Sequence, residues 1–378
     1  MDERLLAERL VGYDTSHPDG LRAAGGFVKG WLESHGIDAV DHDHDGLPVL
    51  VSEVGPDDGP TVILHGHLDV VPAPPEQFVP RIDGDRLIGR GSYDMKGGLS
   101  AMLCALRDHA ASRPRTRVVL VVVPDEESEQ VDHRSTDALV RAGVLRGDFA
   151  ITGEPTQLQI GVQAKGVLAL KAAVLGTSAH GSTPWLGDNA ILKAFDAFRR
   201  IETLPFSRES SDLYDRPSIN LARIRGGEAF NMVPDRCEIT IDIRYVPGQD
   251  PAEILRQIRT VPDLEVLRVV ERGPVIVSRS NPYVVALRDS LGELAGPGEE
   301  GIGLPVGRDG ASDAFAFLEA GIPAVECGPL GAGHHGPDEW VSISSLDRYR
   351  RALVDFLAAV PDAVGDGGAL STTPERSR

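Results

Sequence analysis

The stretch TVILHGHLDVV, residues 61–71, decides how the rest of the sequence is interpreted. Its first half is apolar and typical of a strand, whereas its second half places His65, His67 and Asp69 at alternate positions. Successive side chains of an extended strand point to opposite faces, so these three would point the same way. A strand that served only the core would carry Val, Ile or Leu there. We therefore interpret the end of this strand as part of a site.

Two further apolar runs end in acidic residues. TRVVLVVVPDEE (116–127) ends in Glu126 and Glu127, and FAITGEP (149–155) contains Glu154. A continuous apolar run is typical of a strand buried on both faces of a sheet covered by helices. In open α/β sheets, ligands bind outside the carboxyl ends of the strands. The pattern predicts an α/β fold with a mixed, mostly parallel sheet, helices on both faces and a site at the strand ends.

A chain of 378 residues exceeds one typical core and predicts two domains. Near residue 164 the pattern changes to alternating strands and short helices, and near residue 281 the α/β pattern returns. We expect a catalytic domain of residues 1–163 and 279–360 with a smaller α+β sandwich domain, residues 164–278, inserted into it. The tail, residues 361–378, is polar and rich in glycine, which predicts disorder.

Composition excludes several classes of partner. The net charge of −19 disfavours binding to nucleic acid or to an anionic membrane. No apolar run reaches the roughly 20 residues that span a bilayer. The N-terminus lacks the apolar core of a signal peptide, and three widely spaced cysteines give no disulfide framework. We expect a cytoplasmic protein.

The acids and histidines together form a candidate set for two metal ions: His67, Asp94, Glu127, Glu154 and one of His334 and His335. Oxygen and imidazole ligands suit zinc, cobalt or manganese. Two ions about 3.5–4 Å apart can share a carboxylate and activate a water molecule. Composition by itself does not decide which of the acids are ligands.

Eight short motifs, in one order along residues 5–358, resemble those of a known family. It is the zinc-dependent metallopeptidase and deacylase family of acetylornithine deacetylase, succinyl-diaminopimelate desuccinylase, aminoacylase and glutamate carboxypeptidase. The motifs are HGHLDVVP (65–72), GRGSYDMKGG (89–98), PDEES (124–128), GEPT (153–156), GTSAHGSTP (176–184), NMVPDRCEITIDIR (231–244), GASDA (310–314) and HHGPDEWV (334–341).

The resemblance implies two zinc ions per subunit, with cobalt or manganese as substitutes. His67 and Glu154 would hold one ion, Glu127 and His335 the other, and Asp94 would bridge them. His335 is preferred over His334 because the family places a Glu four residues after this ligand, here Glu339.

Two further residues receive roles from the resemblance. Asp69 would hydrogen-bond His67 and orient it. Glu126 would be the general base that takes a proton from the attacking water and later passes it to the leaving amine. His65 shares a strand face with His67, but the family uses the second histidine, so we expect His65 to be structural.

The inserted domain resembles the dimerisation domain of the family, which implies a homodimer. His180 would reach the active site of the partner subunit and donate to the oxyanion. Asn231 and Arg244 resemble substrate-binding positions of the family. The guanidinium of Arg244 suits a free α-carboxylate, and Arg308 would do similar work.

The sequence departs from the family in one loop, since SEQVDHRSTDA (128–138) stands where many relatives carry a glycine-rich stretch. The resemblance implies that the acid at the position of Glu154 is Glu in deacylases and carboxypeptidases and Asp in aminopeptidases, so Glu154 favours the first two. We expect hydrolysis of the amide of an N-acyl amino acid, as in acetylornithine deacetylase or succinyl-diaminopimelate desuccinylase. The alternatives are a carboxypeptidase or dipeptidase acting on a short peptide, and a catalytically silent metal-binding homologue.

Overall fold

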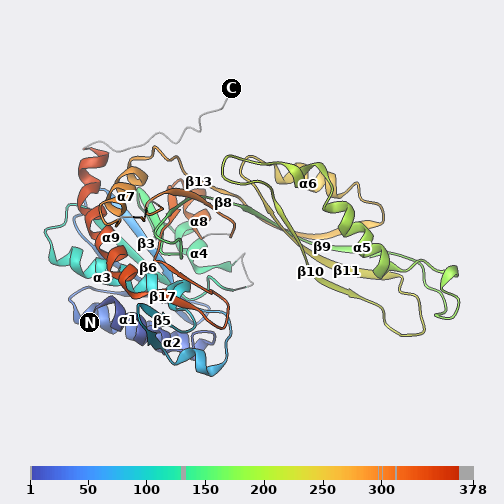
Figure 1. The fold of residues 1–378 in the computed structure, drawn as a ribbon, viewed down its shortest axis with the longest axis horizontal. Coiled ribbons are helices and arrows are strands. Elements are labelled where there is room, and N and C mark those ends of the chain that lie inside the picture. The colour runs from blue at the N-terminus through green and yellow to red at the C-terminus, as the bar shows by residue number, and fades with distance from the viewer. Residues whose placement is uncertain (1, 129–132, 297, 300, 311–312, 366–378) are drawn as a thin grey trace. The chain divides into compact units, whose positions relative to one another are not determined.

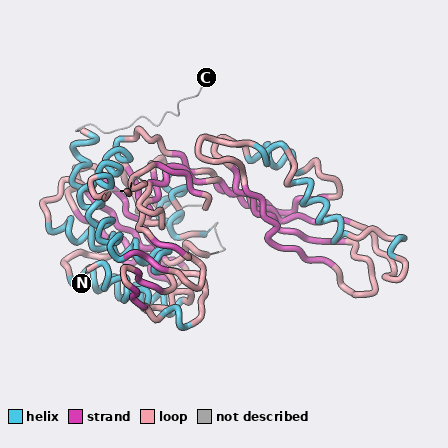
Figure 2. The backbone as a smooth tube through the Cα atoms, viewed as in Figure 1, coloured by secondary structure: helices cyan, strands magenta, loops and turns pink. Residues whose placement is uncertain are grey.

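The computed structural model describes residues 2–128, 133–296, 298–299, 301–310 and 313–365. The chain folds as two compact units. Unit 1 comprises residues 1–162, 277–306 and 313–378, and unit 2 comprises residues 163–276 and 307–312. Figure 1 labels many of the helices and strands of both units, and Figure 2 shows which segments are helix, strand and loop.

The largest sheet belongs mostly to unit 1 and has the strand order β1-β2-β6-β3-β7-β15-β8; β14 and also β13, whose residues are counted with unit 2, pair with β8. These strands are β1 (Val40–His44), β2 (Leu47–Val54), β3 (Thr61–His67), β6 (Arg117–Val123), β7 (Phe149–Thr152), β8 (Ile160–Ala164), β13 (Val275–Ile276), β14 (Pro305–Arg308) and β15 (Ala324–Glu326). The central strands β6, β3, β7 and β15 are parallel, and the outer pairings of β1, β2, β8 and β13 are antiparallel. The predicted fold class, a mixed α/β sheet, is confirmed.

Helices cover both faces of the central strands. The helices of unit 1 are α1 (Glu3–Val11), α2 (Pro18–Ser34), α3 (Gly97–Ala111), α4 (Ser135–Arg141), α7 (Pro282–Gly292), α8 (Ala314–Glu319) and α9 (Ile343–Val364). A Cβ atom built on Gly66 would lie 3.2 Å from Leu99 of α3, whereas the ring of His65 packs edge-on against Phe317 of α8. His65 and Gly66 are neighbours in β3 and point to opposite faces, so α3 and α8 lie on opposite sides.

The apolar runs form the buried centre of this sheet. In β6 every residue after Arg117 is buried, as expected for a strand with helices on both sides. A small four-stranded sheet, in the order β16-β17-β5-β4, completes unit 1. Its strands are β4 (Arg81–Asp83), β5 (Arg86–Ile88), β16 (Gly331–Ala332) and β17 (Trp340–Ser342).

Unit 2 is an antiparallel sheet with helices packed on one face. The order is β10-β11-β9-β12, formed by β9 (Gly166–Leu175), β10 (Ser218–Gly226), β11 (Arg236–Tyr245) and β12 (Leu264–Arg272). Burial alternates along β11, and its inward residues share one core with α5 (Ala190–Ile201) and α6 (Pro251–Ile258). The alternation is that of a sheet with one covered face. This is the α+β sandwich predicted for the inserted domain.

Several bounds differ from those predicted, and the first part of unit 2 spans residues 163–276 against the predicted 164–278. Residues 307–309 belong with unit 2, because Lys165 forms an ion pair with Asp309 at 2.7 Å and the Tyr214 hydroxyl donates to the Arg308 carbonyl at 2.9 Å. The predicted tail begins too early, since α9 continues to Val364. The Pro361 carbonyl accepts from the Gly365 amide, which closes one more turn. Residues 366–378 lie outside the described residues.

Candidate metal centre

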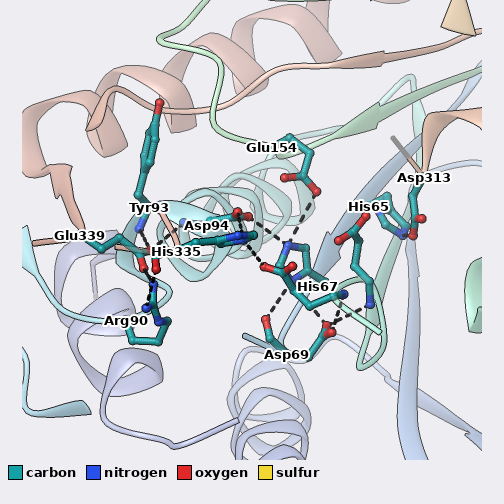
Figure 3. Close-up of polar contacts among 12 residues, drawn as sticks. His65, His67, Asp69, Arg90, Tyr93, Asp94, Glu154, Asp313, His335 and Glu339 are labelled. Atoms are coloured by element: carbon teal, nitrogen blue, oxygen red, sulfur yellow. Dashed lines mark hydrogen bonds and ion pairs between the residues drawn. The ribbon is translucent and has the colours of Figure 1, made fainter. Parts of the chain in front are cut away.

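The candidate site lies at the carboxyl ends of three parallel strands of unit 1. His67 is the last residue of β3, Glu127 follows the end of β6 after a short turn, and Glu154 lies two residues beyond β7. Asp94 comes from the turn that leads into α3, and His335 from the loop between β16 and β17. Figure 3 shows His67, Asp94, Glu154 and His335 close together. This is the sheet edge where α/β folds bind ligands.

The first group of donors is His67, Asp94 and Glu154, whose ligand atoms lie within 4.8 Å of one another. His67 Nε2 lies 3.2 Å from Asp94 Oδ1 and 3.7 Å from Glu154 Oε1. His67 Nδ1 lies 2.9 Å from the backbone oxygen of Asp69, so this nitrogen carries the donated proton and Nε2 faces the acids. A neutral imidazole held this way is suited to bind a metal through Nε2.

The second group is Asp94, Glu127 and His335. His335 Nε2 lies 2.8 Å from Glu127 Oε1 and 3.3 Å from Asp94 Oδ2. Asp94 therefore faces both groups, one carboxylate oxygen toward each, which is the placement required of a bridging ligand. His334 belongs to neither group of described residues. The sequence also predicted these five residues as a set, and their binding of metal stays a prediction.

The electrostatics of the two groups favour cations. Burial raises the pKa of Glu154 well above its usual range, and the nearby Asp94 adds to the rise. Hydrogen bonds to Asp94 and Glu127 raise the pKa of His335 to about 10. His67 is buried, which acts to lower its pKa, yet its bonds with Asp69 and Asp94 raise that pKa well above the usual value. Clustered oxygen and imidazole donors of this kind suit zinc and similar ions.

Asp69 holds the turn that carries Glu126 and Glu127 rather than only orienting His67. Its carboxylate accepts from the backbone amides of Glu126 and Glu127, at 3.1 and 2.7 Å. His67 Nδ1 lies closer to the Asp69 carbonyl, at 2.9 Å, than to its carboxylate, at 3.4 Å. The predicted hydrogen bond from His67 to Asp69 thus runs mainly to the backbone oxygen.

Glu126 lies beside the two groups but belongs to neither. Burial raises the pKa of its carboxyl to about 8, although the guanidinium of Arg134 acts to lower it. Arg134 Nη1 donates to Glu126 Oε1 at 2.7 Å. A carboxyl group that lies outside both donor groups and has a raised pKa is suited to accept and return a proton. The sequence did not predict the contact with Arg134.

A buried ion pair that the sequence did not predict supports the second group. Glu339 receives the Arg90 guanidinium at 2.6 Å and the backbone amides of Tyr93 and Asp94, both at 3.1 Å. Arg90 also donates to the carbonyl of His335, whose φ of 61° is unusual for a residue other than glycine. Figure 3 shows this cluster next to Asp94. The only signal in the sequence was the position of Glu339 four residues after His335.

The other predicted residues lie in unit 2. His180 and Asn231 are exposed neighbours, because the Gly181 amide donates to the Asn231 carbonyl at 2.7 Å. Arg244 lies on β11, and its Nε donates to both oxygens of Asp242, at 3.0 and 3.1 Å. Arg308 ends β14 and is partly buried. Their predicted roles in substrate binding stay predictions.

The chain belongs to Peptidase family M20/M25/M40, whose model matches residues 63–359, and this confirms the family resemblance. Together with a desuccinylase relative, this family identifies the chain as a hydrolase that acts on amide or peptide bonds.

Named relatives and a solved structure agree with this family. A putative [LysW]-lysine/[LysW]-ornithine hydrolase of Pyrobaculum aerophilum is 30% identical over 80% of this chain and 84% of the relative. A succinyl-diaminopimelate desuccinylase of Xanthomonas euvesicatoria is 29% identical over 76% of this chain and 80% of the relative. The crystal structure of a tripeptidase from Staphylococcus aureus has the same fold, with a TM-score of 0.79, 20% identity and coverage of 95% and 98% of the two chains. None of the described helices is both long and apolar enough to cross a bilayer.

Proposed function

We propose that this protein is a dinuclear metal-dependent amidohydrolase that cleaves the amide bond of an N-acyl amino acid. The observation that carries the proposal is the pair of donor groups that share Asp94 at the carboxyl ends of the parallel strands. His67 and Glu154 would hold one ion, Glu127 and His335 the other. Zinc suits these donors, with cobalt or manganese as substitutes.

When bound, two such ions polarise the scissile carbonyl and lower the pKa of the attacking water. The chain supplies the remaining chemistry. Glu126 accepts the proton of the attacking water and then gives it to the nitrogen of the leaving amine. Glu127, the neighbouring acid, would instead bind a metal ion as part of the second donor group. One of the two adjacent carboxylates would thus transfer a proton and the other would hold metal. Asp69 holds the backbone amides of both acids and fixes their placement.

The substrate class is supported by the relatives, whose names describe the hydrolysis of [LysW]-lysine or [LysW]-ornithine and the desuccinylation of succinyl-diaminopimelate. A free α-carboxylate on such a substrate would bind a guanidinium, and Arg244 and Arg308 are the candidates. Asn231 would hydrogen-bond the substrate, and His180 would donate to the oxyanion from the partner subunit. The role of His180 requires a dimer in this proposal.

A homodimer through unit 2 is supported by its exposed apolar side chains. Trp185 is 75% exposed, Leu192 63% and Phe195 48%, and β10 is an exposed edge strand. Exposed apolar side chains and strand edges are features that partner chains cover. Light scattering of the purified protein should give the mass of a dimer, and a monomer with full activity would contradict the role of His180.

A second candidate is a peptidase that removes a residue from a short peptide. The family is described as a peptidase family, and a tripeptidase has the same fold. The same donor arrangement could serve hydrolysis of a peptide or of an N-acyl amino acid. The two candidates differ only in the group attached to the scissile nitrogen or carbonyl. Hydrolysis of dipeptides faster than that of acyl-amino acids would select the peptidase.

The deciding experiment is a screen of N-acetyl and N-succinyl amino acids against di- and tripeptides, using protein loaded with zinc. Release of free amine is measured with a fluorogenic amine reagent. Glu126→Gln is the matched control, and it should keep bound zinc while losing turnover. No hydrolysis of any acyl-amino acid or peptide, or full turnover by Glu126→Gln, would refute the proposal.

A further inference from the structure

Arg134 is a buried cation beside the site that the proposed reaction does not yet use. Its side chain is about 9% exposed, and its Nη1 donates to Glu126 Oε1 at 2.7 Å. The same nitrogen contacts Asp313 Oδ1 at still shorter range. Arg134 therefore joins the predicted general base to an acid that lies 179 positions further along the chain.

A second set of contacts holds Arg134 and Glu126 side by side. Asp125 accepts from the Ser135 amide at 2.7 Å and from its hydroxyl at 2.6 Å. Asp125 precedes Glu126, and Ser135 follows Arg134, so this pairing brings the two ends of the loop together. Because Asp125 binds Ser135, the neighbouring residues Glu126 and Arg134 are brought within contact distance of each other.

Asp313, the second acid that contacts Arg134, is also held in place. Asp313 is 2% exposed, and its Oδ2 accepts from the Thr136 hydroxyl at 2.9 Å. His65 Nε2 lies 2.9 Å from the same hydroxyl. The Thr136 hydroxyl gives its proton to Asp313, so its oxygen accepts from the Nε2–H of His65. This gives a role to the histidine that the sequence marked as structural.

We propose that Arg134 is a positioning residue for Glu126. It holds one carboxylate oxygen, Oε1, and leaves the other free to take the proton of the attacking water. The inference rests on the proposed function, in which Glu126 is the general base. Asp69 anchors only the backbone amide of Glu126, and the Glu side chain would otherwise sample several rotamers about three bonds. A general base must lie within hydrogen-bond reach of its proton, so fixing this carboxylate raises the rate.

The test compares Arg134→Gln with a control at the other end of α4, Arg141→Gln; Arg134 directly precedes that helix. Arg141 has a side chain that is 67% exposed and lies 3.8 Å from Asp137. We expect Arg134→Gln to lower kcat about 100-fold, which is within the contribution of a general base, with little change in KM. Bound zinc should be unchanged, because Arg134 belongs to neither donor group. Arg141→Gln should match the wild type.

Rescue separates positioning from a purely structural role. Arg134→Lys keeps the charge and should retain more turnover than Arg134→Gln. Millimolar guanidinium should restore part of the kcat of Arg134→Ala, since it can occupy the space left beside Glu126. Should Arg134→Gln fail to fold because Asp313 is left buried without a cation, Arg134→Gln/Asp313→Asn removes both charges and should show the same fall in kcat.

A readout other than activity distinguishes this inference from the proposed function. Crystal structures of the wild type and Arg134→Gln should show one conformer of Glu126 in the first and several in the second. A wild type that hydrolyses nothing defeats the proposed function, while the conformers of Glu126 still decide whether Arg134 positions it. An unchanged kcat, or an unchanged Glu126 conformer in the variant, would overturn the inference.

Discussion

Replacing Glu339 by Gln should destabilise unit 1 strongly, although Glu339 touches no substrate in the proposed reaction. Arg90 is 4% exposed and Glu339 1%, and their charged atoms lie 2.6 Å apart. A buried ion pair contributes little net stability, but removing one partner leaves the other charge buried and uncompensated. Glu339→Gln would leave the guanidinium of Arg90 in that state.

The magnitude follows from the contacts of Glu339. Loss of one partner of a buried pair costs about 3–5 kcal/mol. Gln keeps one carbonyl oxygen, which can still accept from the amides of Tyr93 and Asp94, so we expect the lower end, about 3 kcal/mol. Glu339→Ala also removes the acceptor of those two amides, at about 1 kcal/mol or more each, and should cost about 5 kcal/mol in total. The order of the two variants is therefore part of the prediction.

The assay is urea unfolding of the chelated protein, followed by tryptophan fluorescence. Trp31 is 6% exposed and lies in unit 1, whereas Trp185 of unit 2 is 75% exposed and should change little on unfolding. The double variant Arg90→Met/Glu339→Gln removes the unpaired charge and should recover part of the loss. Glu339→Gln should also bind zinc about 10–100-fold more weakly, because the pair supports Asp94 and His335.

The matched control breaks an exposed ion pair of the same unit. Arg115 and Asp362 have side chains that are 59% and 74% exposed, so Asp362→Asn should leave the free energy of unfolding unchanged within error. The reasoning is refuted if Glu339→Gln unfolds at the same urea concentration as Asp362→Asn with the same m-value.

Further predictions concern metal, pH and thiols. Chelation should abolish turnover and lower stability, and zinc at 100 times its Kd should restore turnover and about 2.7 kcal/mol of stability; equal turnover after chelation would contradict the metal site. Burial lowers the pKa of His65 to about 4 from about 6.5. The unfolded chain thus binds this proton at a higher pH than the folded chain, and stability falls as the pH drops from about 6.5 to about 4. The difference is about 3 kcal/mol in the chelated protein. His65→Asn should lack this part of the pH dependence in urea titrations, and an identical slope would contradict the assignment. Burial raises the pKa of Cys104 to about 12 and that of Cys327 above its usual range. Both thiols should resist a thiol reagent until urea unfolds the protein, and rapid labelling of the native protein would show that they are accessible.

The strand ends of the site could be predicted because their signal is local. An apolar run that ends in polar residues predicts a buried strand with polar side chains at its carboxyl end. This pattern indicated His67, Glu127 and Glu154 as site residues. Asp94 and His335 have no such signal, since they lie on loops whose path depends on the fold. The family resemblance, and not periodicity, singled them out.

The supporting pairs could not be predicted for a different reason. Arg90 and Glu339 are 249 positions apart, and Arg134 and Asp313 are 179 apart. Binary patterning says which side chains of one element face inward, but it does not say which charged residues of distant loops meet. A buried Arg and a solvated Arg have the same appearance in a sequence.

Hydrogen bonds within the chain explain how several acids of the site can lie close together even without a bound metal ion. Asp94, Glu127 and Glu154 come from separate loops and would repel one another. Glu339 accepts a hydrogen bond from the backbone amide of Asp94, and Asp69 accepts from those of Glu126 and Glu127. These bonds fix the backbone that carries the acids. Within the cluster, His67 and His335 carry the positive charge, since hydrogen bonds to the acids keep both pKa values raised. A metal ion that binds to the nitrogens of His67 and His335 must displace those protons. Metal binding to the cluster should therefore depend on pH through these two histidines.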